Sequence, residues 1–206
     1  MKIKNLVFDL GGVIIDLSPT RTVEAFSDLS GVRPEVVRDA YLAEPEFFAY
    51  ERGEISDVEF RLAVKRILKF DTPDEAFDKA WNAMLVDLPL AKLNLLDNLR
   101  EQFRVTLLSN TNNIHLDFVN REMLPKVSDR LTLDEYFHTP YYSHLMGKRK
   151  PDAAIFQQVL HENSFIPEET LFLDDNPENI QSAARLGIQT FLVKHPDEVI
   201  HFFNGL

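Results

Sequence analysis

Apolar residues follow two patterns along this chain: short unbroken runs, and longer stretches with helical spacing. Four short runs predict strands, at residues 3–8, 104–109, 170–174 and 189–193. Short and nearly all-apolar runs are typical of a parallel sheet that is covered on both faces. Because each run leads into a polar turn and then a helical stretch, the pattern predicts an α/β fold.

The segment between the first two predicted strands has good helix starts and no convincing strand. Ser18-Pro19 is an N-cap residue followed by proline, and 56–59 (SDVE) and 72–75 (TPDE) have the spacing of capping boxes. Apolar side chains follow both boxes at helical intervals. We therefore expect an all-helical insertion over residues 17–88.

Four further helices are expected in the rest of the chain. One covers about residues 90–102, and another starts at Pro151. A third is capped by Asn176 and ends at Gly187, which suits the residue after a helix C-cap. The last is a short closing helix after Pro196.

Composition limits the classes of function. The net charge of −11 disfavours nucleic acid as a partner, and the only basic cluster, residues 147–151, is short. The chain has no cysteine, which excludes cysteine chemistry and fits a reducing compartment. No apolar stretch approaches the ~20 residues needed to cross a bilayer. We expect a cytoplasmic protein with no membrane contact and no obligate protein partner.

Polar residues that can carry chemistry lie at or near the ends of the predicted strands. In open α/β sheets the ligand crevice lies outside the carboxyl ends of the strands. The sequence therefore predicts one site, formed by Asp9, by Ser109 and Asn110, by Lys150 from the loop before a helix, and by Asp174 and Asp175.

The order of these motifs resembles the haloacid dehalogenase-like hydrolase superfamily, which consists mostly of phosphatases. The resemblance implies a Rossmann-like core of residues 1–16 and 89–206 with helices on both faces of the sheet, and a small helical cap at 17–88. More narrowly, FDLGGVIIDL, YERGEIS, LLSNTN, RKPDAAIFQQVL and DDNPENI resemble the bacterial α-D-glucose-1-phosphate phosphatase subgroup.

The resemblance also implies roles for individual residues. Asp9 attacks phosphorus and forms an aspartyl-phosphate, while Lys150 bridges Asp9 and the phosphate. Ser109 and the backbone of Asn110 donate hydrogen bonds to phosphoryl oxygens. Gly12 lets the backbone approach the ligand. The expected substrate is a small phosphorylated metabolite, a sugar phosphate such as glucose-1-phosphate.

Mg²⁺ is the cofactor that the resemblance implies. Asp9, the carbonyl of Gly11, and Asp175 are its expected ligands, with Asp174 supporting it directly or through water. Asn179 is expected to orient the shell around the metal.

Position 11 departs from the pattern of most phosphatases in the superfamily. They carry a second Asp two residues after the nucleophile as general acid and base, a function worth roughly 10²–10⁴-fold. Gly11 cannot perform it. The glucose-1-phosphate subgroup shares this glycine, and the anomeric hydroxyl of a sugar is a better leaving group than an ordinary alcohol.

Other functions stay open at this point. A metal-independent 2-haloacid dehalogenase also lacks the second Asp, although the acidic pair at 174–175 argues against it. A β-phosphoglucomutase-like enzyme needs that Asp, and a catalytically silent ligand-binding protein is the alternative to an enzyme. Candidates for substrate choice are Tyr50, Glu51, Arg52 and Trp81 in the cap, and His115 and His144, which we expect in loops near the site.

Overall fold

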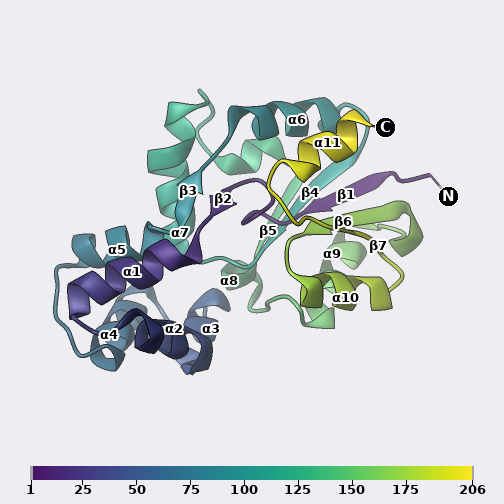
Figure 1. Ribbon diagram of the computed structural model, residues 1–206. Helices are drawn as coiled ribbons and strands as arrows, with labels where there is room; N and C mark the ends of the chain where they lie inside the picture. Colours follow the sequence, from purple (N-terminus) through teal and green to yellow (C-terminus); the bar gives the residue numbers. More distant parts are fainter. Residues whose placement is uncertain (1, 206) are drawn as a thin grey trace.

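The computed structural model describes residues 2–205, and within that span five parallel strands form one sheet (Figure 1). Their order is β5-β4-β1-β6-β7, with β1 in the centre. The strands are β1 (Asn5–Phe8), β4 (Arg104–Ser109), β5 (Thr139–Tyr142), β6 (Thr170–Asp174) and β7 (Gln189–Leu192). The predicted α/β class and four predicted strands are confirmed. Met1 and Leu206, the outermost residues of the predicted core, lie outside the described residues.

Helices cover both faces of the sheet, as the apolar strands require. Leu6 and Phe8 of β1 belong to one apolar cluster and Val7 to another, because successive side chains of a strand point to opposite faces. Figure 1 shows α6 (Leu90–Arg100) and α11 (Glu198–Asn204) on one side of the sheet, and α9 (Ala153–Asn163) and α10 (Pro177–Arg185) on the other.

The edge strand β5 and the helix after β4 are not among the predicted elements. Pro140 lies within β5, which is tolerated because the strand is at the edge of the sheet. Between β4 and β5 the chain forms α7 (Asn113–Phe118), a π-helical turn (Val119–Met123) and two 3₁₀ turns (Leu124–Lys126 and Leu133–Tyr136). The remaining short elements are α8 (Ser143–Met146) and a 3₁₀ turn at Pro167–Glu169.

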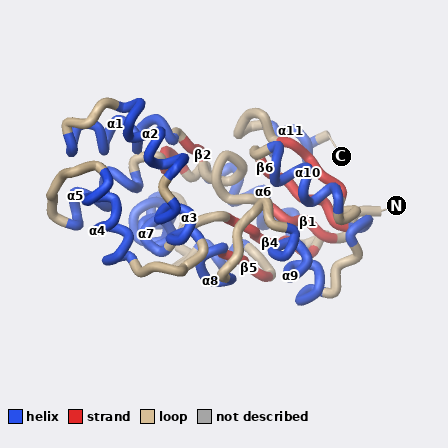
Figure 2. Tube along the Cα trace, turned by 90° about the horizontal axis from the view of Figure 1, so that it is seen from below, coloured by secondary structure: helices blue, strands red, loops and turns tan. Residues whose placement is uncertain are grey.

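Five helices between β1 and α6 pack around an aromatic core of their own. They are α1 (Pro19–Ser30), α2 (Pro34–Ala43), α3 (Pro45–Glu51), α4 (Asp57–Ile67) and α5 (Asp74–Asn82). Phe60 lies at the centre of this core, fully buried, with its ring centroid 4.0 Å from that of Tyr50 and 5.0 Å from that of Trp81. In Figure 2 these helices lie to one side of the sheet strands. We call α1–α5 the cap; its boundaries at residues 17 and 88 stay a prediction.

The expectation of an all-helical insertion is wrong at its two ends. Here β2 (Asp16–Leu17) and β3 (Leu85–Asp87) pair antiparallel, so the chain leaves and re-enters the core through one small ribbon. Lys92 of α6 anchors this ribbon, since its buried ammonium lies 2.8 Å from Asp16 Oδ1. Strands of two and three residues leave no detectable run in the sequence, and only the tertiary pairing defines them.

The predicted helix starts have mixed outcomes. Ser56 and Glu59 form the predicted capping box, and the Asn176 side chain accepts from the Glu178 N–H. The box at Thr72 is wrong: Pro73 takes the N-cap position of α5, so Thr72 lies one residue before the N-cap. Ser18 precedes α1 as predicted, but its side chain makes no capping bond within the described residues.

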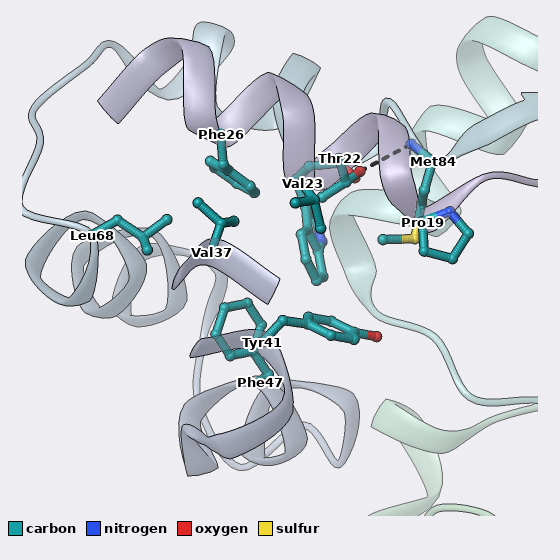
Figure 3. A pocket seen from close by; sticks show the side chains of 10 residues that line it. Pro19, Thr22, Val23, Phe26, Val37, Tyr41, Phe47, Leu68 and Met84 are labelled. Carbon is teal, nitrogen blue, oxygen red and sulfur yellow. Dashed lines mark hydrogen bonds between the residues drawn. The ribbon is translucent and has the colours of Figure 1, made fainter. Parts of the chain in front are cut away.

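A narrow apolar cavity remains inside the cap, between α1 and α2 (Figure 3). Phe26, Val37 and Leu68 line one end, and the Thr22 hydroxyl at the other accepts from the Met84 N–H at 3.0 Å. Its volume of about 30 Å³ is no larger than the space of one water in the liquid. At this size it is a packing gap of the cap core.

Candidate active site

Strand register brings the predicted site residues to one edge of the sheet. Phe8 of β1 lies beside Leu107 of β4 and Leu173 of β6. Asp9 and Asp174 are each the next residue along their strands, and Ser109 ends β4. The carboxyl ends of the three central strands therefore present Asp9, Ser109 and Asp174 together.

Lys150 reaches this edge from the loop before α9 and is buried among oxygen atoms. Its Nζ lies 2.7 Å from Asp9 Oδ1 and 2.7 Å from Asp174 Oδ2, and it donates to the Leu108 carbonyl at 2.8 Å. These contacts use the three donors of an ammonium group. Burial alone would lower the pKa of Lys150, but the charges of Asp174 and Asp9 raise it, so the side chain stays charged.

Asp174 is fully buried, and both its oxygens accept hydrogen bonds. Oδ1 accepts from the Asn176 N–H at 2.8 Å and from Asn179 Nδ2 at 3.0 Å. Oδ2 accepts from Lys150 at 2.7 Å and lies 3.1 Å from Asn179 Nδ2. A carboxylate has about four lone-pair sites, so these contacts account for all of them. Asn179, expected to act around the metal, holds Asp174 in place.

Three carboxylates crowd together beside Lys150. Ligand oxygens of Asp9, Asp174 and Asp175 lie within 4.8 Å of one another. Burial raises the pKa of Asp9 to about 7; Lys150 opposes the shift, and the charge of Asp174 adds to it. Burial, with the charge of Asp174, also raises the pKa of Asp175. A hard divalent cation with oxygen ligands would relieve this repulsion, so the donor set fits Mg²⁺.

Gly12 makes room for this cluster. Its φ is +73°, in the left-handed region, and a Cβ at this position would lie 2.2 Å from Asp175 Oδ2. A side chain at position 12 would therefore push the carboxylate away. The backbone approaches the acidic cluster as closely as it does because residue 12 is glycine.

Leu17 fills the space next to Gly11 where a side chain would project. A Cβ on Gly11 would lie 2.5 Å from Leu17 Cδ1. Leu17 belongs to β2, the strand that leads into the cap. An apolar side chain thus fills the space into which an acidic side chain at position 11 would project.

Ser109 and Asn110 lie beside the carboxylates, and the Asn110 side chain is fixed. Asn110 Nδ2 donates to the Lys150 carbonyl at 2.9 Å, and its Oδ1 accepts from the Lys150 N–H at 2.8 Å. This pair of bonds ties the end of β4 to the lysine loop. Ser109 is buried, and its hydroxyl bonds to no other residue within the described chain.

A cavity of about 150 Å³ lies between the sheet edge and the cap. Gly11, Ser109 and Asn110 line it from the core, and Glu51 and Trp81 from the cap. Two of the four predicted cap candidates therefore face the cavity.

The other two cap candidates have structural contacts instead. Tyr50 is buried; its hydroxyl donates to Asp57 Oδ1 at 2.7 Å and accepts from the Ile114 N–H at 3.3 Å. Arg52 forms two hydrogen bonds with Glu54 at the surface. Neither side chain lines the cavity.

The two histidines lie in helices, so their expected loop positions are wrong. His115 belongs to α7 and lines the cavity, stacked on Trp81 with ring centroids 4.8 Å apart. Burial lowers its pKa to about 3, so it is neutral, and its Nδ1 lies 2.8 Å from Asn82 Oδ1. His144 is in α8 and does not line the cavity.

The three cations of the basic cluster at 147–151 bind side chains of this chain. Lys148 donates to Gln158 Oε1 at 2.7 Å, and Arg149 pairs with Glu51 at 2.9 Å. With Lys150 buried, these three cations are held by contacts inside the protein.

Tyr41 and Asn112 also line the cavity, and neither is among the residues expected from the sequence. Asn112 caps α7 by accepting from the His115 N–H at 3.1 Å and also accepts from Trp81 Nε1 at 3.3 Å. The Asn before an apolar helical stretch was a detectable cap signal. Tyr41 gave no signal, because an aromatic residue in a cap helix is typical of a core position.

Among the described residues, no helix combines the length and the apolar character that crossing a bilayer would require.

Comparison with known proteins identifies the family. The family model for haloacid dehalogenase-like hydrolases matches residues 3–187. D-ribitol-5-phosphate phosphatase of Bacteroides thetaiotaomicron is 33% identical over 189 residues, 92% of this chain and 91% of that protein.

Solved structures give the same result. A HAD family enzyme of B. thetaiotaomicron, in complex with magnesium and inorganic phosphate, aligns with a TM-score of 0.88 at 37% identity, over 98% of this chain and 99% of that one. A predicted HAD-like family hydrolase from Porphyromonas gingivalis aligns with a TM-score of 0.90 at 32% identity, over 100% and 98% of the two chains. The predicted superfamily and fold class are thereby confirmed. The magnesium bound to the B. thetaiotaomicron relative agrees with the acidic cluster of this chain and with the predicted Mg²⁺ cofactor. The chain belongs to the haloacid dehalogenase-like hydrolase family.

Proposed function

We propose that this protein is a Mg²⁺-dependent phosphatase that hydrolyses a small phosphate monoester, a sugar phosphate such as glucose-1-phosphate, through an aspartyl-phosphate on Asp9. The observation that carries the proposal is the acidic cluster of Asp9, Asp174 and Asp175 around one buried lysine. The relative solved with magnesium and inorganic phosphate supports the same chemistry.

Asp9 is the nucleophile in this proposal. Lys150 holds Oδ1 at 2.7 Å, which fixes the carboxylate and stabilises its ionised form. A carboxylate oxygen of Asp9 forms a bond to phosphorus while the ester P–O bond breaks, and the leaving oxygen takes up a proton from solvent water. Water then hydrolyses the aspartyl-phosphate, which releases inorganic phosphate and restores Asp9.

The metal would be held by Asp9, Asp175 and the Gly11 carbonyl. When bound, Mg²⁺ neutralises negative charge on the carboxylates and the phosphoryl oxygens. Asp174 supports the site from behind, since its lone pairs already accept from Lys150, Asn176 and Asn179. Of the two roles open to Asp174, its contacts favour the indirect one.

Ser109, the Asn110 N–H and Gly12 would receive the phosphoryl group. Ser109 lines the cavity, and the Asn110 side chain is tied to the lysine loop by two hydrogen bonds. A backbone donor held in place by such contacts costs little reorganisation when charge develops on the phosphoryl oxygens. The ammonium of Lys150 already uses its three donors, so it would contact phosphate only by exchanging one of them.

The leaving group distinguishes two kinds of substrate. With Gly11 and Leu17 in place of a general acid, an ester of an anomeric hydroxyl is favoured, because it leaves with less protonation. The ribitol phosphatase relative is named for an ester of an ordinary alcohol. A cavity of about 150 Å³ suits a small leaving group in both cases, since pockets for drug-sized ligands are about 300–1,000 Å³.

The test is a screen of phosphorylated metabolites with Mg²⁺, including glucose-1-phosphate and ribitol-5-phosphate, with release of inorganic phosphate as the readout. EDTA should abolish release and added Mg²⁺ restore it. Asp9→Asn should fall to background, because loss of a covalent nucleophile costs up to roughly 10⁶-fold in kcat. Asp129→Asn, which changes an exposed carboxylate, is the matched control.

Two results would contradict the proposal. Chloride release from 2-chloropropionate without metal would favour a dehalogenase. Binding of phosphate esters without turnover of any of them, in a folded protein with Mg²⁺, would favour a silent ligand-binding protein.

A further inference from the structure

The cap side of the cavity carries polar groups that the proposed chemistry does not use. Glu51, at the end of α3, and Tyr41, in α2, both line the cavity opposite Gly11 and Ser109. A group in this position faces the alcohol part of the ester, because the sheet edge would hold the phosphate. The inference therefore rests on the proposed function and concerns the leaving group.

Glu51 is a shielded carboxylate with one oxygen held and one free. Arg149 Nε and Nη2 both lie 2.9 Å from Oε2, and the Glu51 side chain is only 16% exposed. The described residues place no donor on Oε1. Burial raises the pKa of Glu51 although Arg149 opposes the shift, so the carboxylate is poorly hydrated. A shielded acceptor without a donor is stabilised when a ligand donates a hydrogen bond to it.

Arg149 fixes the position of Glu51 from the core. Its guanidinium packs over the Phe48 ring at 4.7 Å while it pairs with Glu51, and it directly precedes Lys150 in the chain. The Glu51 carboxylate is thus held by the same loop that carries Lys150. A substrate hydroxyl bound to Glu51 Oε1 would therefore have a defined position relative to Asp9.

Tyr41 and Trp81 complete this wall of the cavity. In Figure 3 the Tyr41 hydroxyl points away from Phe26 and Leu68, toward the core side of the cap. Trp81 is held by its stacking on His115 and by the bond from Nε1 to Asn112. A fixed indole contacts C–H groups, while a carboxylate and a phenol bind O–H groups.

We propose that Glu51 Oε1, with the Tyr41 hydroxyl, binds hydroxyl groups of the leaving alcohol, and that the enzyme thereby selects phosphate esters of polyhydroxylated alcohols. A site built to hydrogen-bond a hydroxyl rejects an analogue without it strongly, because the buried acceptor is left unpaired. Glu51 is in this proposal a specificity residue and takes no part in bond breaking.

The test compares ribitol-5-phosphate with p-nitrophenyl phosphate, whose leaving group has no neighbouring hydroxyls. Glu51→Gln should lower the ratio of their kcat/KM values by roughly 10- to 100-fold, the effect of one hydrogen bond to a charged group, mainly through KM of the polyol ester. Tyr41→Phe should lower the ratio in the same direction by less. Glu54→Gln, an exposed cap carboxylate paired with Arg52, should leave the ratio unchanged.

The outcomes separate the two proposals. If Glu51→Gln lowers both kcat/KM values equally, or neither, while the wild type is active, the hydroxyl subsite is wrong and the phosphatase stands. If the wild type hydrolyses neither of these esters nor any phosphate ester of the metabolite screen with Mg²⁺, the proposed function fails and the subsite fails with it.

Discussion

Lys150 Nζ lies 2.7 Å from Asp174 Oδ2, and the two side chains are 1% and 0% exposed. The pair is the deepest charged contact of the site. Asp174 holds the Lys150 ammonium next to the Asp9 carboxylate. Acidic residues at this edge thus have different surroundings: Asp174 is fully buried against Lys150, whereas Asp175 is exposed.

Asp174→Asn should destabilise the protein by about 3 kcal/mol, the lower end of the cost of breaking a buried pair, because Asp9 remains as a partner for Lys150. Urea unfolding in EDTA measures this loss. Asp97→Asn, which removes partly exposed pairs with Arg130 and Arg100, should cost no more than about 1 kcal/mol. Equal effects of the two variants would contradict the assigned role of the pair.

Gly12→Ala should weaken Mg²⁺ binding as well as stability, because its Cβ would displace the Asp175 carboxylate. Titration calorimetry with Mg²⁺ gives the first quantity and urea unfolding the second. Gly31→Ala is the matched control: Gly31 has a similar φ of +69°, and a Cβ added there would meet nothing within 4 Å. It should cost about 1–2 kcal/mol of backbone strain and leave Mg²⁺ affinity intact. An unchanged affinity in Gly12→Ala would contradict the close approach.

His115 should make stability fall as the pH drops below 6.5. Its pKa in the folded protein is about 3, against 6.5 when unfolded, so between these values the unfolded chain binds the proton more readily. The stability from the neutral ring is complete above pH 6.5 and is lost as pH falls toward 3.

The measurement is urea unfolding at pH 7.5 and 4.5. Wild type should lose about 2–3 kcal/mol more than His115→Gln between these pH values, since each pKa unit corresponds to about 1.4 kcal/mol. Because each protein is compared with itself at the two pH values, a pH-independent cost of the substitution cancels. His195→Gln, at an exposed position, should follow the wild type; parallel curves for His115→Gln and wild type would refute the buried neutral state.

Phe60→Ala should cost about 3–5 kcal/mol, because the ring is fully buried and contacts Phe47, Tyr50, Phe77 and Trp81. Hydrogen exchange should show the loss chiefly in α1–α5, since these helices have their own apolar core. Leu62→Ala in the same helix changes a side chain that is 62% exposed and should stay within about 0.5 kcal/mol. Uniform loss of protection across the sheet would contradict a separate cap core.

Local patterns predicted the parts of the fold that depend on neighbouring residues. The strands β4 and β6 have the predicted bounds, because a buried parallel strand is a dense apolar run. Pro34 and Pro45 open α2 and α3 at the first helical position, a start signal that could have resolved these helices one by one. By contrast β2 and β3 depend on pairing across about seventy residues of chain, which no local pattern contains.

By itself the sequence determined which residues meet at the candidate site, because a carboxylate at the end of an apolar strand must lie at the carboxyl edge of a parallel sheet. Only the tertiary structure decided what surrounds each group there. It turned Asp174 inward to Lys150, filled the space beside Gly11 with Leu17, and brought Glu51 of the cap against Arg149 of the core. The physical reason is that burial, lone-pair occupancy and contact between distant segments depend on how the whole chain packs.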